Sequence, residues 1–171
     1  MANDFEKEII NKVGADILNS NGMALEKGFI QHGNVSVYEH SLSVAVMCLR
    51  IKKYLPFKVN TRSLVRGALL HDYFLYDWHV ADKSHKWHGF RHARSSWKNA
   101  RRDFALNAVE ENMILSHMFP LNLCALPRYR ETLVIVFTDK LCGAMEVASG
   151  LMTKLHEAVG RKLFRRKLKA E

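Results

Sequence analysis

The residues best suited to chemistry in this chain are its histidines and a few aspartates. Nine of the 171 residues are histidine, and eight of these lie between residues 31 and 118. His71 and Asp72 are adjacent and follow the apolar helical run RSLVRGALL. Neighbouring side chains on a helix point about 100° apart, so both can reach one metal ion only near the flank or end of the helix. A metal site at this doublet therefore needs further ligands from other helices.

Four more residues could supply those ligands. His40 lies among apolar residues in YEHSLSVAVMCL, and Asp139 follows the apolar run TLVIVFT. A carboxylate in such surroundings costs several kcal/mol unless a metal or a cation compensates it. His92 follows a basic segment, and His117 ends the apolar turn MILS. With the doublet, these residues give four imidazoles and two carboxylates, a set that suits two transition-metal ions and is too rich in nitrogen for magnesium alone.

The order of His40, the doublet at 71–72 and the distant Asp139 resembles the HD-domain superfamily of metal-dependent phosphohydrolases, an all-helical fold named for its His-Asp doublet. The additional pair His92 and His117 resembles the members with two-metal sites. The segments QHGNVSVYEHSLSVA, HDYFLYDWH, HGFRHARSSWKNA and PRYRETLVIVFTDK are similar to small stand-alone bacterial HD proteins. The resemblance covers residues 28 to 148.

The resemblance implies two divalent transition-metal ions, Fe or Mn by expectation, with Ni, Co, Zn or Mg as alternatives. The ligands of the first would be His40, His71, Asp72 and Asp139. The ligands of the second would be Asp72, His92 and His117, so that Asp72 bridges the two. A water whose pKa is lowered by the ions would then attack phosphorus in a phosphomonoester or phosphodiester. The expected substrate is a nucleotide or a related phosphorylated small molecule.

Several alternatives stay open at this point. A one-metal site would leave His92 and His117 as substrate contacts or as groups that support the metal ligands. His88 competes with His92 as a ligand because Gly89 allows a tight turn. The chain has Ala93 where many relatives have proline after this histidine. Nothing after His117 resembles the GYP motif, so cyclic-di-GMP hydrolysis is not implied. A di-iron oxygenase with nearly the same ligands and a non-catalytic nucleotide-sensing module are the competing functions.

The net charge of +9 indicates an anionic partner. The distribution of the basic residues along the chain indicates which of them could contact that partner. A basic stretch at 83–102 lies among the histidines. Its candidate phosphate contacts are Lys83, Lys86, Arg91 and Arg94, beside His88 as a further substrate contact. The catalytic candidates beyond the doublet are Arg91 and Asp77, the latter as a general acid or a supporting carboxylate. A solvated helix face is the alternative interpretation of this stretch.

Apolar residues recur at helical spacing along most of the chain, which predicts an all-α HD-type bundle. The helices are expected at 5–18, 36–56, 60–72, 92–109, 110–117 and 130–160, with a surface loop at 78–91. We expect one domain over residues 1–171, with a core at 28–148 and a basic helical tail at 160–171. That tail is interpreted as solvated, with nucleic acid or an acidic membrane as the alternative contact.

The chain has neither the apolar core of a signal peptide in MANDFEKEII nor a run of about 18 apolar residues. Its three cysteines form no CxxC pair. These features predict a cytoplasmic protein without a membrane span. A homodimer is a further expectation.

Overall fold

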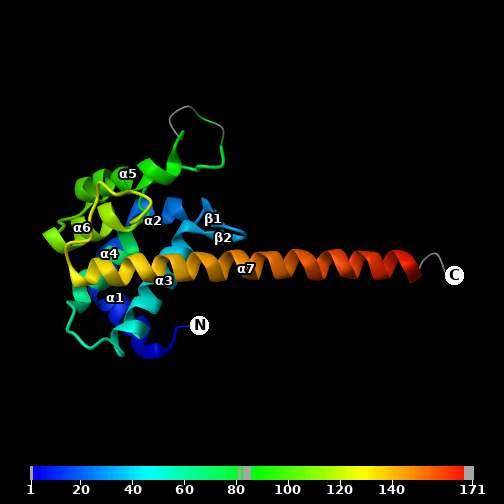
Figure 1. The fold of residues 1–171 in the computed structure, drawn as a ribbon, viewed down its shortest axis with the longest axis horizontal. Helices are drawn as coiled ribbons and strands as arrows, with labels where there is room; N and C mark the ends of the chain where they lie inside the picture. Colours follow the sequence, from blue (N-terminus) through cyan, green and yellow to red (C-terminus); the bar gives the residue numbers. More distant parts are fainter. Residues whose placement is uncertain (1, 81, 83–85, 168–171) are drawn as a thin grey trace.

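The computed structural model describes residues 2–80, 82 and 86–167, and the regular secondary structure of this part of the chain is helical apart from one small ribbon (Figure 1). The all-α prediction is therefore confirmed. The elements are α1 (Asp4–Leu18), α2 (Asn21–Glu26), β1 (Ile30–His32), β2 (Val35–Ser36), α3 (Val37–Lys52), α4 (Thr61–Leu70), α5 (His88–Asp103), α6 (Ala108–Ser116) and α7 (Arg130–Lys167).

Side-chain caps fix where several helices begin. Asn3 accepts the Glu6 amide at the start of α1, and Ser36 accepts the Glu39 amide at the start of α3. In both cases the glutamate side chain returns to the backbone N–H of the cap, which completes a capping box. Asn60 caps α4 at the predicted position. These caps satisfy amides that the first helical turn leaves without a partner.

Helix α4 lies at the centre of the fold and packs against α1, α3, α6 and α7. Each of its residues from Ser63 to Leu70 is buried, in accord with an element surrounded by other helices. Gly67 permits the close packing of α6, because a Cβ atom at this position would lie 2.6 Å from the Met113 side chain. The end of α4 therefore lies in the interior, and so do His71 and Asp72, which follow it directly.

Strands β1 and β2 form an antiparallel ribbon whose turn contains Gly33 in the left-handed region, at φ 60°. The ribbon reaches α7, where a Cβ atom on Gly150 would lie 3.5 Å from the Gly33 Cα. The ribbon and α2 lie just before α3 in sequence, and the short helix α2 has no counterpart in the sequence-based prediction. The ribbon places residues 31 and 32 beside the centre of the bundle.

The later helices differ from the prediction in their bounds. α5 begins at His88, one turn before the expected position, and Phe104 is already extended, so the break lies at residues 104–107 and not near 109. α7 continues to Lys167 and projects beyond the other helices (Figure 1). Among the described helices, none has the length and apolar character needed to cross a lipid bilayer.

Candidate metal centre

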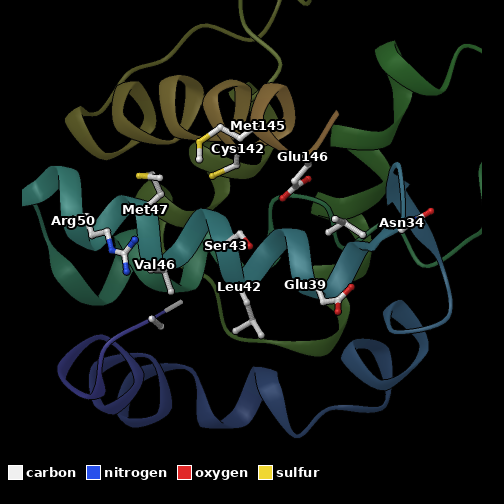
Figure 2. Close-up of a pocket in the computed structure, with 12 residues that line it drawn as sticks. Asn34, Glu39, Leu42, Ser43, Val46, Met47, Arg50, Cys142, Met145 and Glu146 are labelled. Carbon is white, nitrogen blue, oxygen red and sulfur yellow. The ribbon is translucent and has the colours of Figure 1, made fainter. Parts of the chain in front are cut away.

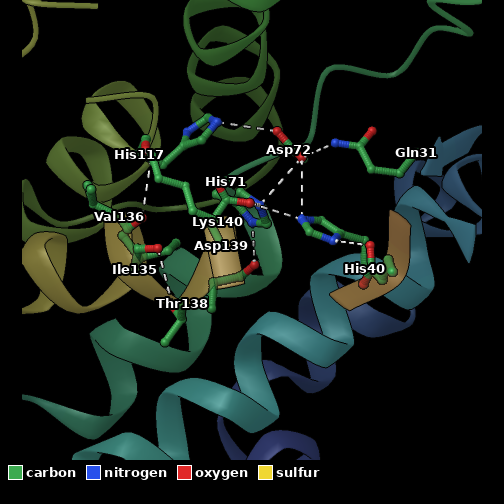
Figure 3. Close-up of polar contacts among 12 residues, drawn as sticks. Gln31, His40, His71, Asp72, His117, Ile135, Val136, Thr138, Asp139 and Lys140 are labelled. Carbon is green, nitrogen blue, oxygen red and sulfur yellow. Dashed lines mark hydrogen bonds and ion pairs between the residues drawn. The ribbon is translucent and has the colours of Figure 1, made fainter. Parts of the chain in front are cut away.

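Five helices bring six side chains together in the interior. Figure 3 labels His40, His71, Asp72, His117 and Asp139 among them. His40 comes from α3, the doublet follows the last turn of α4, and His92 lies in the second turn of α5. His117 follows α6, and Asp139 lies in the third turn of α7. The fold thus brings together all of the predicted metal ligands, which are His40, His71, Asp72, His92, His117 and Asp139. Asp139 is slightly exposed, and the other five are buried.

Asp72 lies between two groups of imidazoles and presents one carboxylate oxygen to each. Oδ2 lies 3.4 Å from His71 Nε2 and 3.9 Å from His40 Nε2. Oδ1 lies 3.2 Å from His92 Nε2 and 3.4 Å from His117 Nε2. A carboxylate in this position can contribute to two adjacent sites at once.

Asp139 belongs to the first group. Its Oδ1 lies 3.1 Å from His40 Nε2 and 3.5 Å from His71 Nε2. The first group therefore consists of two imidazoles and two carboxylates, and the second of two imidazoles and the shared carboxylate. Both sets match the ligand preference of divalent transition metals.

Three of the histidines are oriented by backbone carbonyl groups. Nδ1 of His71 lies 2.8 Å from the carbonyl of Ala68, and Nδ1 of His117 lies 2.8 Å from that of Ile114. Both residues cap the C-terminus of a helix, where the last carbonyls lack an amide partner. Nδ1 of His92 lies 2.9 Å from its own helix carbonyl at His88. A carbonyl only accepts, so Nδ1 carries the proton and each neutral ring presents Nε2 as a lone pair.

The positions of these Nε2 atoms show whether the residues could bind a metal ion. The Nε2 atoms of His92 and His117 lie 2.8 Å apart, so the two rings need either a shared proton or a metal ion between these nitrogens. His71 Nε2 and Asp72 Oδ1 are buried without a hydrogen-bond partner in the described part of the chain. Converging lone pairs and unpartnered buried atoms are unfavourable unless a cation lies among them. The donor set therefore fits bound metal ions.

His40 is oriented by a carboxylate, which sequence analysis missed. Its Nδ1 lies 2.9 Å from Glu146 Oε2, while its Nε2 faces Asp139. Glu146 follows Asp139 by seven residues, two turns of α7, so both lie on one face of that helix. This spacing is the sequence signal that could have identified Glu146.

Glu146 also borders a cavity of about 610 Å³ that lies between α3 and α7. Figure 2 shows its side chain at the end of this cavity nearest to Asn34, whereas Cys142 and Met145, which precede it in α7, lie farther from Asn34. Glu146 and the metal cluster therefore contact opposite edges of the His40 ring, Glu146 at Nδ1 and the cluster at Nε2.

The charges of the cluster follow from these contacts. Burial raises the pKa of Asp72, but His71, His117 and His92 outweigh that effect and hold the pKa well below its ordinary value. Burial opposes the protonation of His40, yet hydrogen bonds to Asp139 and Glu146 raise its pKa to about 10. Ionised carboxylates at the centre favour a cation, which can be a metal ion in place of protons.

Two residues of the β1 strand support the cluster and were not among the predicted ligands. Gln31 Nε2 donates to Asp72 Oδ2 at 2.6 Å, which fixes the orientation of the shared carboxylate. The His32 ring lies edge-on to that of His40, with centroids 5.5 Å apart. His32 also forms a possible ligand group with His40 and Glu146. No local sequence pattern marks either residue, because their position depends on the two-stranded ribbon.

A cavity of about 800 Å³ opens beside the cluster and is bordered by Asp72, His92, His117 and Asp139. His88, a predicted substrate contact, also lines it, and its ring stacks at 4.6 Å on that of His92. The His88 Nδ1 lies 3.0 Å from the Tyr76 hydroxyl. The position of His88 beside this cavity is compatible with substrate contact.

The other predicted substrate and catalytic residues lie elsewhere or outside the described residues. Lys86 and Arg91 are exposed and do not border the cavity. Arg94 lines a separate hollow near residues 122–129. Asp77 accepts the amide of the nearby residue 79 in a local turn and does not border the cavity. Lys83 falls outside the described residues.

The family model of the HD domain matches residues 37–144, which is more than half of the chain, and the chain therefore belongs to the HD domain family. The matched segment contains all six residues of the cluster and ends just before Glu146. No curated protein and no solved structure gives a significant match. HD domains typically bind divalent metals and hydrolyse phosphate esters, and the cluster described above agrees with such metal binding.

Proposed function

We propose that this protein is a metal-dependent phosphohydrolase that cleaves a phosphomonoester or phosphodiester of a small molecule. The observation that carries the proposal is the 2.8 Å approach of His92 Nε2 to His117 Nε2, with both Nδ1 atoms held by backbone carbonyls. Two imidazole nitrogens this close need a proton or a metal ion between them, and a bound metal ion can take the place of that proton. HD family membership supports phosphoryl chemistry at this site.

Two ions would be held in the proposed site. The first would be bound by His40, His71, Asp72 and Asp139. The second would be bound by Asp72, His92 and His117. Divalent ions in these positions lower the pKa of water and neutralise charge on the phosphoryl oxygens. Fe or Mn is the proposed metal, as in the sequence-based expectation.

The protein's own residues keep this centre in place. Gln31 holds the shared carboxylate of Asp72, and Glu146 holds the ring of His40. Lys140 donates from Nζ to the carbonyl of His117 at 2.9 Å, which anchors the turn that carries this ligand. Lys140 also borders the cavity, where an ammonium group can attract a phosphate oxygen. These contacts would hold the ligand atoms and the substrate phosphate in a fixed relation.

Other expectations remain proposals with less specific support. Catalytic roles for Arg91 and Asp77 would require them to approach the cavity, which neither of them borders. A nucleotide substrate, a homodimer and a cytoplasmic location remain sequence-based predictions.

The test compares the wild-type protein with Asp72→Ala and with Asp4→Ala as the matched control. We expect elemental analysis to find about two transition-metal ions per wild-type chain, and metal-dependent release of inorganic phosphate from ester substrates. Asp72→Ala should lose metal and turnover together because both ligand groups lose the shared carboxylate. Asp4→Ala should retain both, since Asp4 is exposed in the first turn of α1 and pairs with Lys7 of the same helix.

Three results would contradict the proposal. Unchanged turnover in Asp72→Ala would remove the assigned role of Asp72. Oxygen consumption without phosphate release would indicate a di-iron oxygenase. Nucleotide binding without any turnover would indicate a sensing module.

A further inference from the structure

The cavity beside the metal cluster has two chemically different ends. One end carries the polar residues of the cluster and the ammonium group of Lys140. The other is formed by apolar side chains of α7 together with Trp78 and Met118. The α7 residues of this apolar wall are Gly143, Ala144, Val147, Ala148 and Leu151. A cavity of about 800 Å³ is large enough for a small organic molecule.

The spacing of the wall residues makes them one continuous stripe on α7. Positions 143, 144, 147, 148 and 151 follow the three- and four-residue steps that place side chains on one helical face. Ala144 and Ala148 have small side chains, which leave room for a ligand close to the helix, whereas the His32 ring lies beside Gly143. Leu151 at the end of the stripe is 64% exposed, so the wall presents apolar surface that packing within the described residues does not cover. Such surface gains free energy when an apolar ligand covers it.

The polar end is suited to a single phosphate group. Lys140 is the only lysine or arginine that lines the cavity within the described part of the chain. Two of its three N–H donors bond the carbonyls of His117 and Val136, which leaves one for a ligand. Asp72 borders the same end with Oδ1 unpartnered in that part of the chain, which marks the position of the metals. A longer phosphate chain would meet no further lysine or arginine on the cavity wall among the described residues.

Building on the proposed function, we infer that the substrate is a monophosphate ester of an apolar alcohol or phenol. Its phosphate lies at the metal cluster and Lys140, and its organic group lies along the α7 wall. During hydrolysis the bond from the water oxygen to phosphorus forms and the ester P–O bond breaks. The leaving oxygen takes one proton from water, so the products are an apolar alcohol and inorganic phosphate.

The test measures kcat/KM of the metal-loaded protein for 1-naphthyl phosphate, glycerol 2-phosphate, AMP and ATP. We expect 1-naphthyl phosphate to be preferred by about 10- to 100-fold, the discrimination that a few apolar contacts provide. Ala148→Asp places a charge on the wall at an exposed position, so folding should be retained. It should remove most of this preference, lowering kcat/KM for 1-naphthyl phosphate about 10-fold more than kcat/KM for glycerol 2-phosphate. Ser149→Asp is the matched control, because Ser149 is also exposed and does not border the cavity.

Calorimetric titration of 1-naphthyl phosphate into the wild type and both variants separates this inference from the proposed function. Binding that Ala148→Asp weakens and Ser149→Asp preserves would support the apolar site even if no ester is hydrolysed. Absence of binding, or binding that Ala148→Asp does not weaken, would overturn the inference. Equal or better hydrolysis of glycerol 2-phosphate, AMP or ATP would also overturn it while the phosphohydrolase assignment stands.

Discussion

Glu146 differs from the other groups that orient the histidines, because it is a carboxylate and they are carbonyls. A carboxylate on Nδ1 makes the ring more basic and fixes its tautomer. We expect Glu146→Ala to lower the affinity for the first metal by about 10- to 100-fold. Glu146→Gln should lower it less, because the amide oxygen can still accept from His40 Nδ1. Competition with a chromophoric chelator measures both affinities.

Met145→Ala is the control for these variants, since Met145 is the exposed neighbour of Glu146 on α7. Thermal unfolding of the metal-free proteins shows whether a loss of affinity reflects a loss of folding. Wild-type metal affinity in Glu146→Ala would exclude a positioning role for this carboxylate.

Glu26 predicts a pH dependence of stability. It is fully buried, and neither of its carboxylate oxygens has a hydrogen-bond partner in the described part of the chain. Burial, assisted by the charge of Asp72, raises the pKa of Glu26 well above its ordinary value. The folded state therefore holds this proton more tightly than the unfolded state does. The resulting stability is fully present below the unfolded pKa and is lost as the pH rises through the folded pKa.

Glu26→Gln removes this titration. The variant should gain about 1–3 kcal/mol in free energy of unfolding relative to the wild type between pH 5 and pH 8. Urea unfolding at both pH values provides the measurement. If the free energy of unfolding changes equally with pH in both proteins, the pKa of Glu26 is the same in the folded and unfolded states, which would contradict the prediction.

The cluster residues could be predicted because their order along the chain resembles a family pattern. The doublet after an apolar run and an aspartate within another apolar run are visible without a structure. Gln31 and His32 could not be predicted, since a two-stranded ribbon of five residues brings them to Asp72 and His40. The basic residues near the histidines were a weaker guide, because charge in sequence does not show which face of α5 a side chain occupies.

Helix α4 is joined to two neighbouring helices by a buried arginine. Arg66 is buried, donates to Asp16 Oδ1 at 2.6 Å and lies 3.5 Å from Glu110 Oε1. It thereby links α4 to α1 and α6. Arg66→Ala should destabilise the protein by about 3–5 kcal/mol, because Glu110 is left buried with less compensation. Denaturant unfolding measures the loss.

Arg62→Ala is the matched control, since Arg62 also approaches Glu110, at 3.6 Å, but is 59% exposed. Its removal should cost less than about 1 kcal/mol. If both variants lose the same free energy of unfolding, the buried contact between Arg66 and Glu110 does not stabilise the protein more than the exposed one does.

Helix bounds were predictable where a cap is written in the sequence. Ser36 with Glu39 and Asn60 before α4 are examples. The start of α5 was not, because Trp87 makes no side-chain cap and adopts a left-handed conformation. The break before α6 carried a readable signal, the capping box of Asn107 and Glu110, which apolar periodicity obscured.

The molecule combines a helical bundle with a projecting end of α7 (Figure 1). Met152 and Leu155 are mostly exposed although they are large and apolar. A chain that ends at His156 should therefore keep its metal content and lose less than about 0.5 kcal/mol of stability. Thermal unfolding and elemental analysis test this, and a loss above about 2 kcal/mol would show that the removed residues stabilise the bundle.

One continuous helix, α7, supplies Asp139 to the cluster, Glu146 to the ring of His40, and the wall that ends at Leu151. Each inserted or deleted residue in a helix turns everything beyond it by about 100° and shifts it by about 1.5 Å. An insertion or deletion between residues 139 and 151 would thus displace both the Glu146 carboxylate and the apolar wall relative to Asp139. Natural variation in chain length should be excluded from this interval and tolerated after residue 156, a pattern that homologous sequences can reveal.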